Sequence, residues 1–171
     1  MTTSAYAPLS IEPTAPARLR RFACMMYEGV LLFAVVFLGS YLFDTLTQSR
    51  HGLMMRPERQ AWLFICIGAY FLLCWRKNGQ TLPMKTWHIR LVDRNGQVPS
   101  LPRLAGRYAL AWALPLVAAA AIWTLAMASG WPAVNSLIVV APFANFLGTA
   151  TGSGQFLHDR LAGTRLVDHR P

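Results

Sequence analysis

Two charged residues, Glu28 and Arg21, lie where a largely apolar chain would carry few charges, and they are the first candidates for chemistry. Glu28 stands inside the apolar run Ala23–Phe43, and Arg21 precedes it by seven positions. A carboxylate at mid-membrane costs about 2.5–3.5 kcal/mol on insertion scales, so Glu28 requires a partner or a function. Seven residues put Arg21 on nearly the same helix face but about 10 Å away along the axis, where the two could bracket a third group. Glu28 is either a proton- or cation-binding carboxylate or half of an ion pair within a helix bundle.

A second set of polar residues falls in the last apolar segment of the chain. Asn135, Asn145 and Thr149 are spaced so that an α-helix would present them on one face. Such a face either lines a water-filled path or forms the hydrogen-bonding seam by which membrane helices associate. The small-residue spacing Gly148-x-x-x-Gly152 is typical of the second case.

Other kinds of chemistry are not indicated. The four histidines are scattered, and the three cysteines fall in apolar runs without a C-x-x-C spacing, so neither a metal site nor a disulfide framework is predicted. Residues 79–86 resemble a phosphate-binding loop only superficially. Met84 replaces the second glycine of that motif, and Pro83 removes an N–H that would bind phosphate. We therefore expect no cofactor and no enzymatic activity.

Four apolar segments must position these residues. The chain has 171 residues, is 54% hydrophobic and only 13% charged, and has a mean hydropathy of +0.35, which favours a membrane protein over a soluble one. A helix of about 20 apolar residues crosses roughly 30 Å of hydrocarbon. We predict spans at about 23–43, 57–77, 108–128 and 133–150, preceded by a flexible tail over residues 1–17. Residues 18–171 then form a single domain.

The net charge of +9 has a topological explanation. Placing both termini and the loop between the second and third segments on one side puts 13 Lys and Arg there, against 3 on the other side. Because basic loops stay in the cytoplasm, we expect both termini to be cytoplasmic. The bilayer is thus the expected partner, and no nucleic-acid motif accompanies the charge.

The cytoplasmic pieces carry signs of structure. Alternating residues up to Asp93, followed by Asn95-Gly96, predict a short β-hairpin in the middle loop. The letters of Arg165–Asp168 repeat those of Arg90–Asp93, so we hypothesise that these two segments pair as strands beneath the bundle. Residues 156–161 predict a short amphipathic turn at the membrane interface. The expected fold is an all-α membrane protein with four transmembrane helices and a structured cytoplasmic loop.

Several of these residues resemble the RDD family of bacterial membrane proteins. The resemblance lies in Arg21 with Glu28, in the loop residues 79–93, and in the ending Leu157–Thr164, and it covers roughly residues 18–168. The family is named for one arginine and two aspartates. The resemblance implies that Arg21 and Asp159 are two of these, that Glu28 replaces the first aspartate, and that the protein lies in the inner membrane.

Transport, including sodium–proton exchange, has been proposed for some members of that family. The leading hypothesis is transport of a small ion or solute by a homo-oligomer, because four short helices make a thin bundle. Glu28 and Asp159 would be the titratable or ligand-binding carboxylates, and Arg21 the counter-charge that sets their pKa or gates access. In the alternative, the protein is a scaffold or assembly partner in a membrane complex, and the same three residues tie the first helix to the C-terminal segment.

Overall fold

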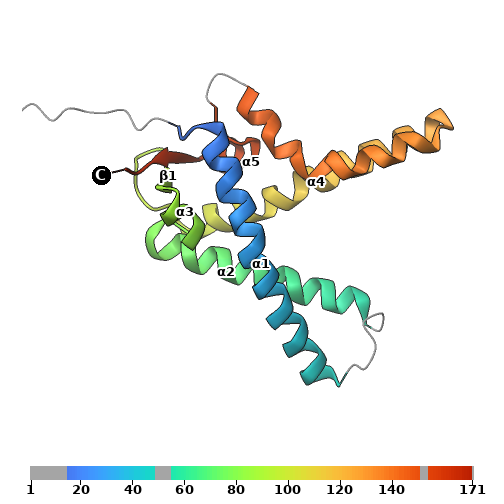
Figure 1. Ribbon diagram of the computed structural model, residues 1–171, viewed down its shortest axis with the longest axis horizontal. Helices are drawn as coiled ribbons and strands as arrows, with labels where there is room; N and C mark the ends of the chain where they lie inside the picture. Colours follow the sequence, from blue (N-terminus) through green and yellow to red (C-terminus); the bar gives the residue numbers. More distant parts are fainter. Residues whose placement is uncertain (1–14, 49–54, 151–153, 171) are drawn as a thin grey trace, which may run out of the picture.

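The computed structural model describes residues 15–48, 55–150 and 154–170, and most of them are helical (Figure 1). In chain order the elements are α1 (Arg18–Thr47), α2 (Arg56–Asn78), α3 (Leu82–Thr86), β1 (Ile89–Asp93), α4 (Leu101–Ser129), η1 (Pro132–Ala150), α5 (Leu157–Ala162) and β2 (Thr164–Asp168).

Each of the four predicted spans falls in one of the four long helices. Among the described residues, α1 and α4 are long and apolar enough to cross a membrane. At about 1.5 Å per residue these two helices exceed the thickness of the hydrocarbon core. The other two predicted spans lie in α2, which is charged near both ends, and in η1, whose shorter apolar stretch is Ala133–Asn145.

The fourth apolar segment, η1, is a 3-10 helix, where the sequence predicts an α-helix. At its beginning, Val134 N donates to Trp131 O at 3.0 Å, a backbone bond that reaches back three residues. Pro142 inside the segment has no N–H, so one backbone hydrogen bond is missing there in either helix geometry. The change matters because three residues per turn, rather than 3.6, alters which side chains share a face.

The two segments of matching sequence pair as antiparallel strands, which confirms that hypothesis. Leu91 stands opposite Leu166, and Arg90 stands opposite Val167. The predicted hairpin is wrong, because β1 pairs with β2 and not with the residues that follow it. The turn itself forms: Asp93 Oδ1 accepts from the backbone N–H of both Asn95, at 2.8 Å, and Gln97, at 2.9 Å.

Side chains and a helix end close the edges of this small sheet. Gln80 Nε2 donates to Ile89 O at 2.8 Å beside β1. Beside β2, Gln155 exchanges two hydrogen bonds with the Leu166 backbone, both of 2.9 Å. The C-cap of α2, Gly79, accepts from Leu91 N at 2.8 Å. A two-stranded sheet alone is marginal in stability, so these bonds fix it against the helices.

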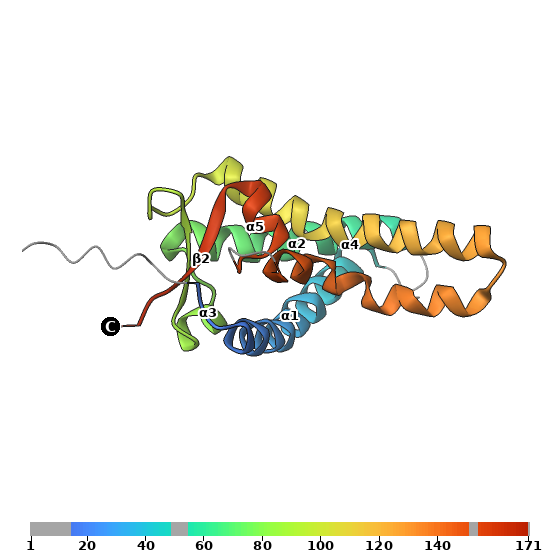
Figure 2. The same cartoon turned by 90° about the horizontal axis from the view of Figure 1, so that it is seen from above.

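The sheet, α3 and α5 lie together at one end of the molecule, and two helical hairpins extend away from them (Figures 1 and 2). One hairpin is α1 with α2, and the other is α4 with η1. The start of α1 is tied to the sheet because Arg20 Nη1 donates to Asp168 Oδ2 at 2.6 Å. The core of buried residues, which includes Trp75, Leu91 and Leu104, also lies at this end.

Helix α5 forms where a short amphipathic turn is predicted. His158 and Asp159 point inward and are buried, whereas Leu161 is 59% exposed. The burial of Asp159 has a physical cause: Arg107 of α4 meets it in the interior, so the carboxylate has a partner there.

Candidate functional site

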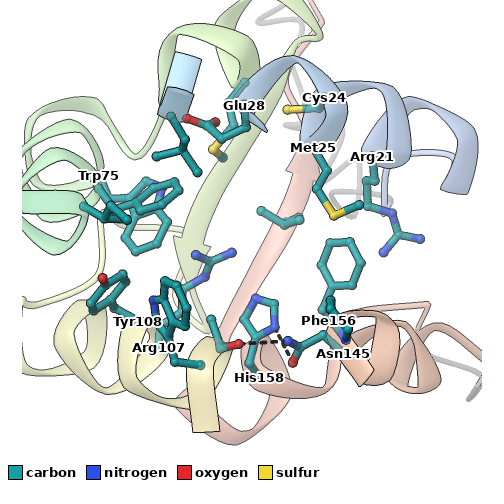
Figure 3. A pocket seen from close by; sticks show the side chains of 18 of the residues that line it. Arg21, Cys24, Met25, Glu28, Trp75, Arg107, Tyr108, Asn145, Phe156 and His158 are labelled. Carbon is teal, nitrogen blue, oxygen red and sulfur yellow. Dashed lines mark hydrogen bonds between the residues drawn. The ribbon is translucent and has the colours of Figure 1, made fainter. Parts of the chain in front are cut away.

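A cavity of about 430 Å³ lies where the two hairpins meet the sheet (Figure 3). Its walls come from α1, α2, α4 and η1, and from α3, α5 and the sheet at one end. The walls are mainly apolar and include five aromatic rings, those of Phe71, Trp75, Tyr108, Trp112 and Phe156. Three side chains that are charged in water, Arg21, Glu28 and Arg107, also line it.

Glu28 reaches this cavity from α1 and is 8% exposed. Its Oε1 accepts from the Tyr70 hydroxyl on α2 at 2.7 Å, and its Oε2 accepts from the Thr81 hydroxyl at 2.5 Å. Thr81 is held in place as the N-cap of α3, where its side chain also accepts from Met84 N. The carboxylate is therefore bound by two neutral donors, one for each oxygen.

Arg21 lines the same cavity, seven residues earlier on α1, and is 4% exposed. Its Nη1 donates to Gly154 O, and its guanidinium lies 5.2 Å from the centre of the Phe156 ring. Figure 3 shows that the side chains of Arg21 and Glu28 point in different directions. Arg21 thus contacts the segment leading into α5, and its described partners do not include Glu28.

Asp159, the third predicted residue, is fully buried behind the cavity wall. Its Oδ1 accepts from Arg107 Nε at 2.6 Å and from the Thr164 hydroxyl at 3.1 Å. Burial alone would raise the pKa of Asp159, but the charge of Arg107 and these hydrogen bonds hold it below its usual value. The aspartate is therefore an anion at neutral pH, and Arg107 rather than Arg21 is its ion-pair partner.

Arg107 is the principal residue that sequence reasoning missed, because it was counted only among the loop charges. It lies two turns inside α4, is 7% exposed, and its guanidinium stands 4.3 Å from the centre of the Trp75 ring. A signal was available in the sequence. Ser100 and Pro102 predict that this helix begins near residue 101, which already places Arg107 within it.

Two consecutive hydrogen bonds link η1 to α4 and α5 on the far side of the cavity. Asn145 Nδ2 donates to Ala111 O at 3.1 Å, which leaves its Oδ1 facing His158 Nδ1 at 2.9 Å. Because an amide oxygen only accepts, His158 carries its proton on Nδ1. Burial lowers the pKa of His158 to about 4, an effect that Asp159 opposes and Arg107 reinforces. This histidine, which sequence reasoning also missed, is neutral at pH 7.

The predicted polar face does not form as one stripe. Asn145 is buried against α4 and α5, whereas Asn135 is exposed near the other end of η1. Ten residues of a 3-10 helix are three turns and about a third, so the two amides point in different directions. The side chain of Thr149 lies outside the described residues.

The profile of the RDD family matches residues 15–163 of this chain. The chain belongs to the RDD family. The match confirms the resemblance on which the assignment of Arg21, Glu28 and Asp159 rests, and together with the long apolar helices it identifies a membrane protein. None of the curated proteins compared with the chain matches it. Within the RDD domain, two of these three residues line the cavity, and the third is coupled to it through Arg107.

Proposed function

We propose that this RDD-family protein crosses the bacterial inner membrane four times, with both termini in the cytoplasm. The pairing of β1 with β2 supports this topology, because paired strands must lie on the same side of the bilayer. If α4 crosses, η1 must therefore cross back before β2. The bond between Arg20 and Asp168 supports the same side for the start of α1, with α1 and α2 as a second pair of crossings.

Within this topology, the function that the cavity supports best is transport of a small ion or solute, without enzymatic chemistry. The observation that carries the proposal is Glu28, a carboxylate on a membrane-spanning helix that lines a cavity and is held by neutral hydroxyls. Intramembrane carboxylates of this kind mark ion and proton pathways. Asp159, in contrast, is already neutralised by Arg107 and acts as a positioning residue.

Glu28 is suited to couple occupancy of the cavity to movement of the helices. Its two hydrogen bonds join α1 to α2, through Tyr70, and to α3, through Thr81. Protonation of the carboxylate, or binding of a cation to it, weakens both bonds because the oxygens lose negative charge. The part of α1 around Glu28 would then be free to shift relative to α2 and α3, while Arg20 still holds the start of α1 to the sheet. We expect a homo-oligomer to carry out this cycle.

Flux measurements in sealed vesicles test the proposal. Purified protein is reconstituted with a pH-sensitive dye inside, and proton movement is recorded under imposed pH, sodium and potassium gradients. Wild-type protein should conduct, and Glu28→Gln should abolish flux while keeping its thermal unfolding midpoint. Glu58→Gln, which changes an exposed glutamate at the far end of α2, is the matched control and should conduct normally.

Two results would overturn transport. One is wild-type protein that shows no flux under any of these gradients, and the other is Glu28→Gln that conducts like wild type. Absence of flux together with a membrane partner that co-purifies at fixed stoichiometry would favour the scaffold role instead.

A further inference from the structure

We infer that the cavity binds an amphipathic organic anion, with its oxyanion head on the guanidinium of Arg107 and its apolar body against the aromatic walls. The inference deepens the proposed function by naming a class of solute. The inference rests on the proposed function only for the transport of the bound solute, because binding itself can be measured without transport.

The first support is the unused hydrogen-bonding capacity of Arg107. A guanidinium has five N–H donors, and among the described residues only Nε of Arg107 has an acceptor, Asp159. The side chain is more than nine-tenths buried, and Figure 3 shows its guanidinium projecting into the middle of the cavity. The two Nη groups can thus bind a ligand in the cavity, and a carboxylate or phosphate would accept from both of them together.

Arg21 adds a second cation to the same cavity. It gives one hydrogen bond to Gly154 O, and its buried Nε has no acceptor in the described part of the chain. Its aromatic contact with Phe156 holds the guanidinium at the cavity wall without neutralising it. Two guanidinium groups thus line one cavity, and each has donors to spare.

The charges facing the cavity favour an anion over a cation. Asp159 offsets one arginine from behind the wall, and His158 is neutral with its Nδ1 proton given to Asn145. Glu28 is the only carboxylate among the lining residues, and both of its oxygens are already occupied by hydroxyls. An organic cation would therefore meet one carboxylate that is already hydrogen-bonded and two repelling arginines.

The apolar walls indicate that the ligand is more than an inorganic ion. About 430 Å³ falls within the roughly 300–1,000 Å³ of sites for small organic molecules. Beyond Arg107 along α4, the surface is formed by Tyr108 and Trp112, and Ile67 and Phe71 face the cavity from α2. A chain or ring attached to the oxyanion would remove this apolar surface from water.

Tryptophan quenching tests the inference, because Trp75 and Trp112 line the cavity. The probes are brominated decanoate, which enters from the bilayer, and 4-bromobenzoate, which enters from water. Brominated decanol and decylamine have the same tail as the first probe without its negative charge. In neutral-lipid nanodiscs, at least one anion should quench saturably and bind at least tenfold more tightly than the alcohol and the amine. Quenching by decanoate alone would identify a membrane-borne ligand, and quenching by bromobenzoate alone an aqueous one.

Substitutions identify the head-group site. Arg107→Lys keeps a positive charge but loses the paired Nη donors, so it should weaken anion binding about tenfold or more. Arg103→Lys, at an exposed arginine one turn earlier on α4, should leave binding unchanged. Should Arg107→Lys fail to fold, Arg21→Gln provides a second variant with the same expected direction.

The inference is overturned if the alcohol or the amine binds as tightly as both anions, or if folded Arg107→Lys and Arg21→Gln bind the anions like wild type. Anion binding without any flux would retain this inference and remove the proposed transport. Flux that depends on Glu28, without anion binding, would retain the proposed transport and remove the inferred anion site.

Discussion

Asp159 and Asp168 are both paired with an arginine at 2.6 Å, yet the two pairs differ in environment. Arg107 and Asp159 are removed from water, whereas the side chains of Arg20 and Asp168 are 18% and 22% exposed. In the interior, removing one partner leaves an uncompensated charge. Near the surface, water replaces the lost partner at little cost.

We therefore predict that Asp159→Asn destabilises the protein by about 3–5 kcal/mol, because it leaves Arg107 buried without an anion. Asp168→Asn, the same chemical change in the more exposed pair, should cost about 1 kcal/mol or less. Thermal and denaturant unfolding in a neutral detergent would measure both. Equal losses for the two variants would contradict the assignment of Asp159 to a buried ion pair.

His158 should make stability depend on pH. Its pKa is about 4 in the folded protein and near 6.5 in the unfolded chain, because burial disfavours the charged ring. The unfolded chain therefore takes up the proton first, and stability falls as pH drops from about 6.5 to about 4. The full loss from this residue is about 3 kcal/mol.

Unfolding midpoints at pH 7.5 and pH 5 measure this effect. The stability that the charged Asp159 contributes is lost only as the pH falls to about its usual pKa of 3.8, so it does not change between these two pH values. His158→Gln should flatten the difference between the two pH values. His169→Gln, at an exposed histidine close to the C-terminus, should retain it. A His158→Gln profile as steep as that of wild type would remove this histidine as the cause.

At the scale of elements, Gly79 joins helix α2 to strand β1. Its φ of +69° suits glycine, and a Cβ at this position would stand 2.5 Å from Leu91 O. Gly96 in the turn after β1 has a similar φ of +77°, but a Cβ there would have nothing within 4 Å. Comparing substitutions at these two glycines therefore separates the cost of backbone strain from the cost of steric overlap.

We predict that Gly96→Ala costs about 1–2 kcal/mol, the penalty for a left-handed residue with a Cβ. Gly79→Ala should cost at least about 1 kcal/mol more, because relieving the overlap also breaks the bond from Leu91 N to Gly79 O. Unfolding midpoints of both variants provide the measurement. If Gly96→Ala is the more damaging change, α2 does not end against β1 in this way.

At the scale of the whole molecule, the sheet is the feature that constrains topology. It joins the middle loop to the C-terminal segment, so both must be on one side of the membrane. We predict that Asn95→Cys and Arg170→Cys, in a background without the native cysteines, react with an impermeant maleimide only after spheroplasts are lysed. Trp131→Cys, in the turn between α4 and η1, should react in intact spheroplasts. Labelling of Asn95→Cys and Trp131→Cys under the same conditions would reject four crossings.

The sequence by itself determined where the long helices lie, and the repeated letters identified the two strands that pair. Hydropathy and strand patterns are properties of neighbouring residues, so they can be read without knowing what lies nearby in space. Local signals also placed Glu28 in the first apolar helix and Asp159 near the last strand.

Only the tertiary structure decided which groups meet. Asp159 pairs with Arg107, 52 positions away, although Arg21 was the expected counter-charge. Asp159 is buried against that partner, and the 3-10 geometry of η1 separated Asn135 from Asn145. These outcomes depend on how helices pack and how buried charges are compensated. Both are set by contacts between distant segments, which no local pattern records.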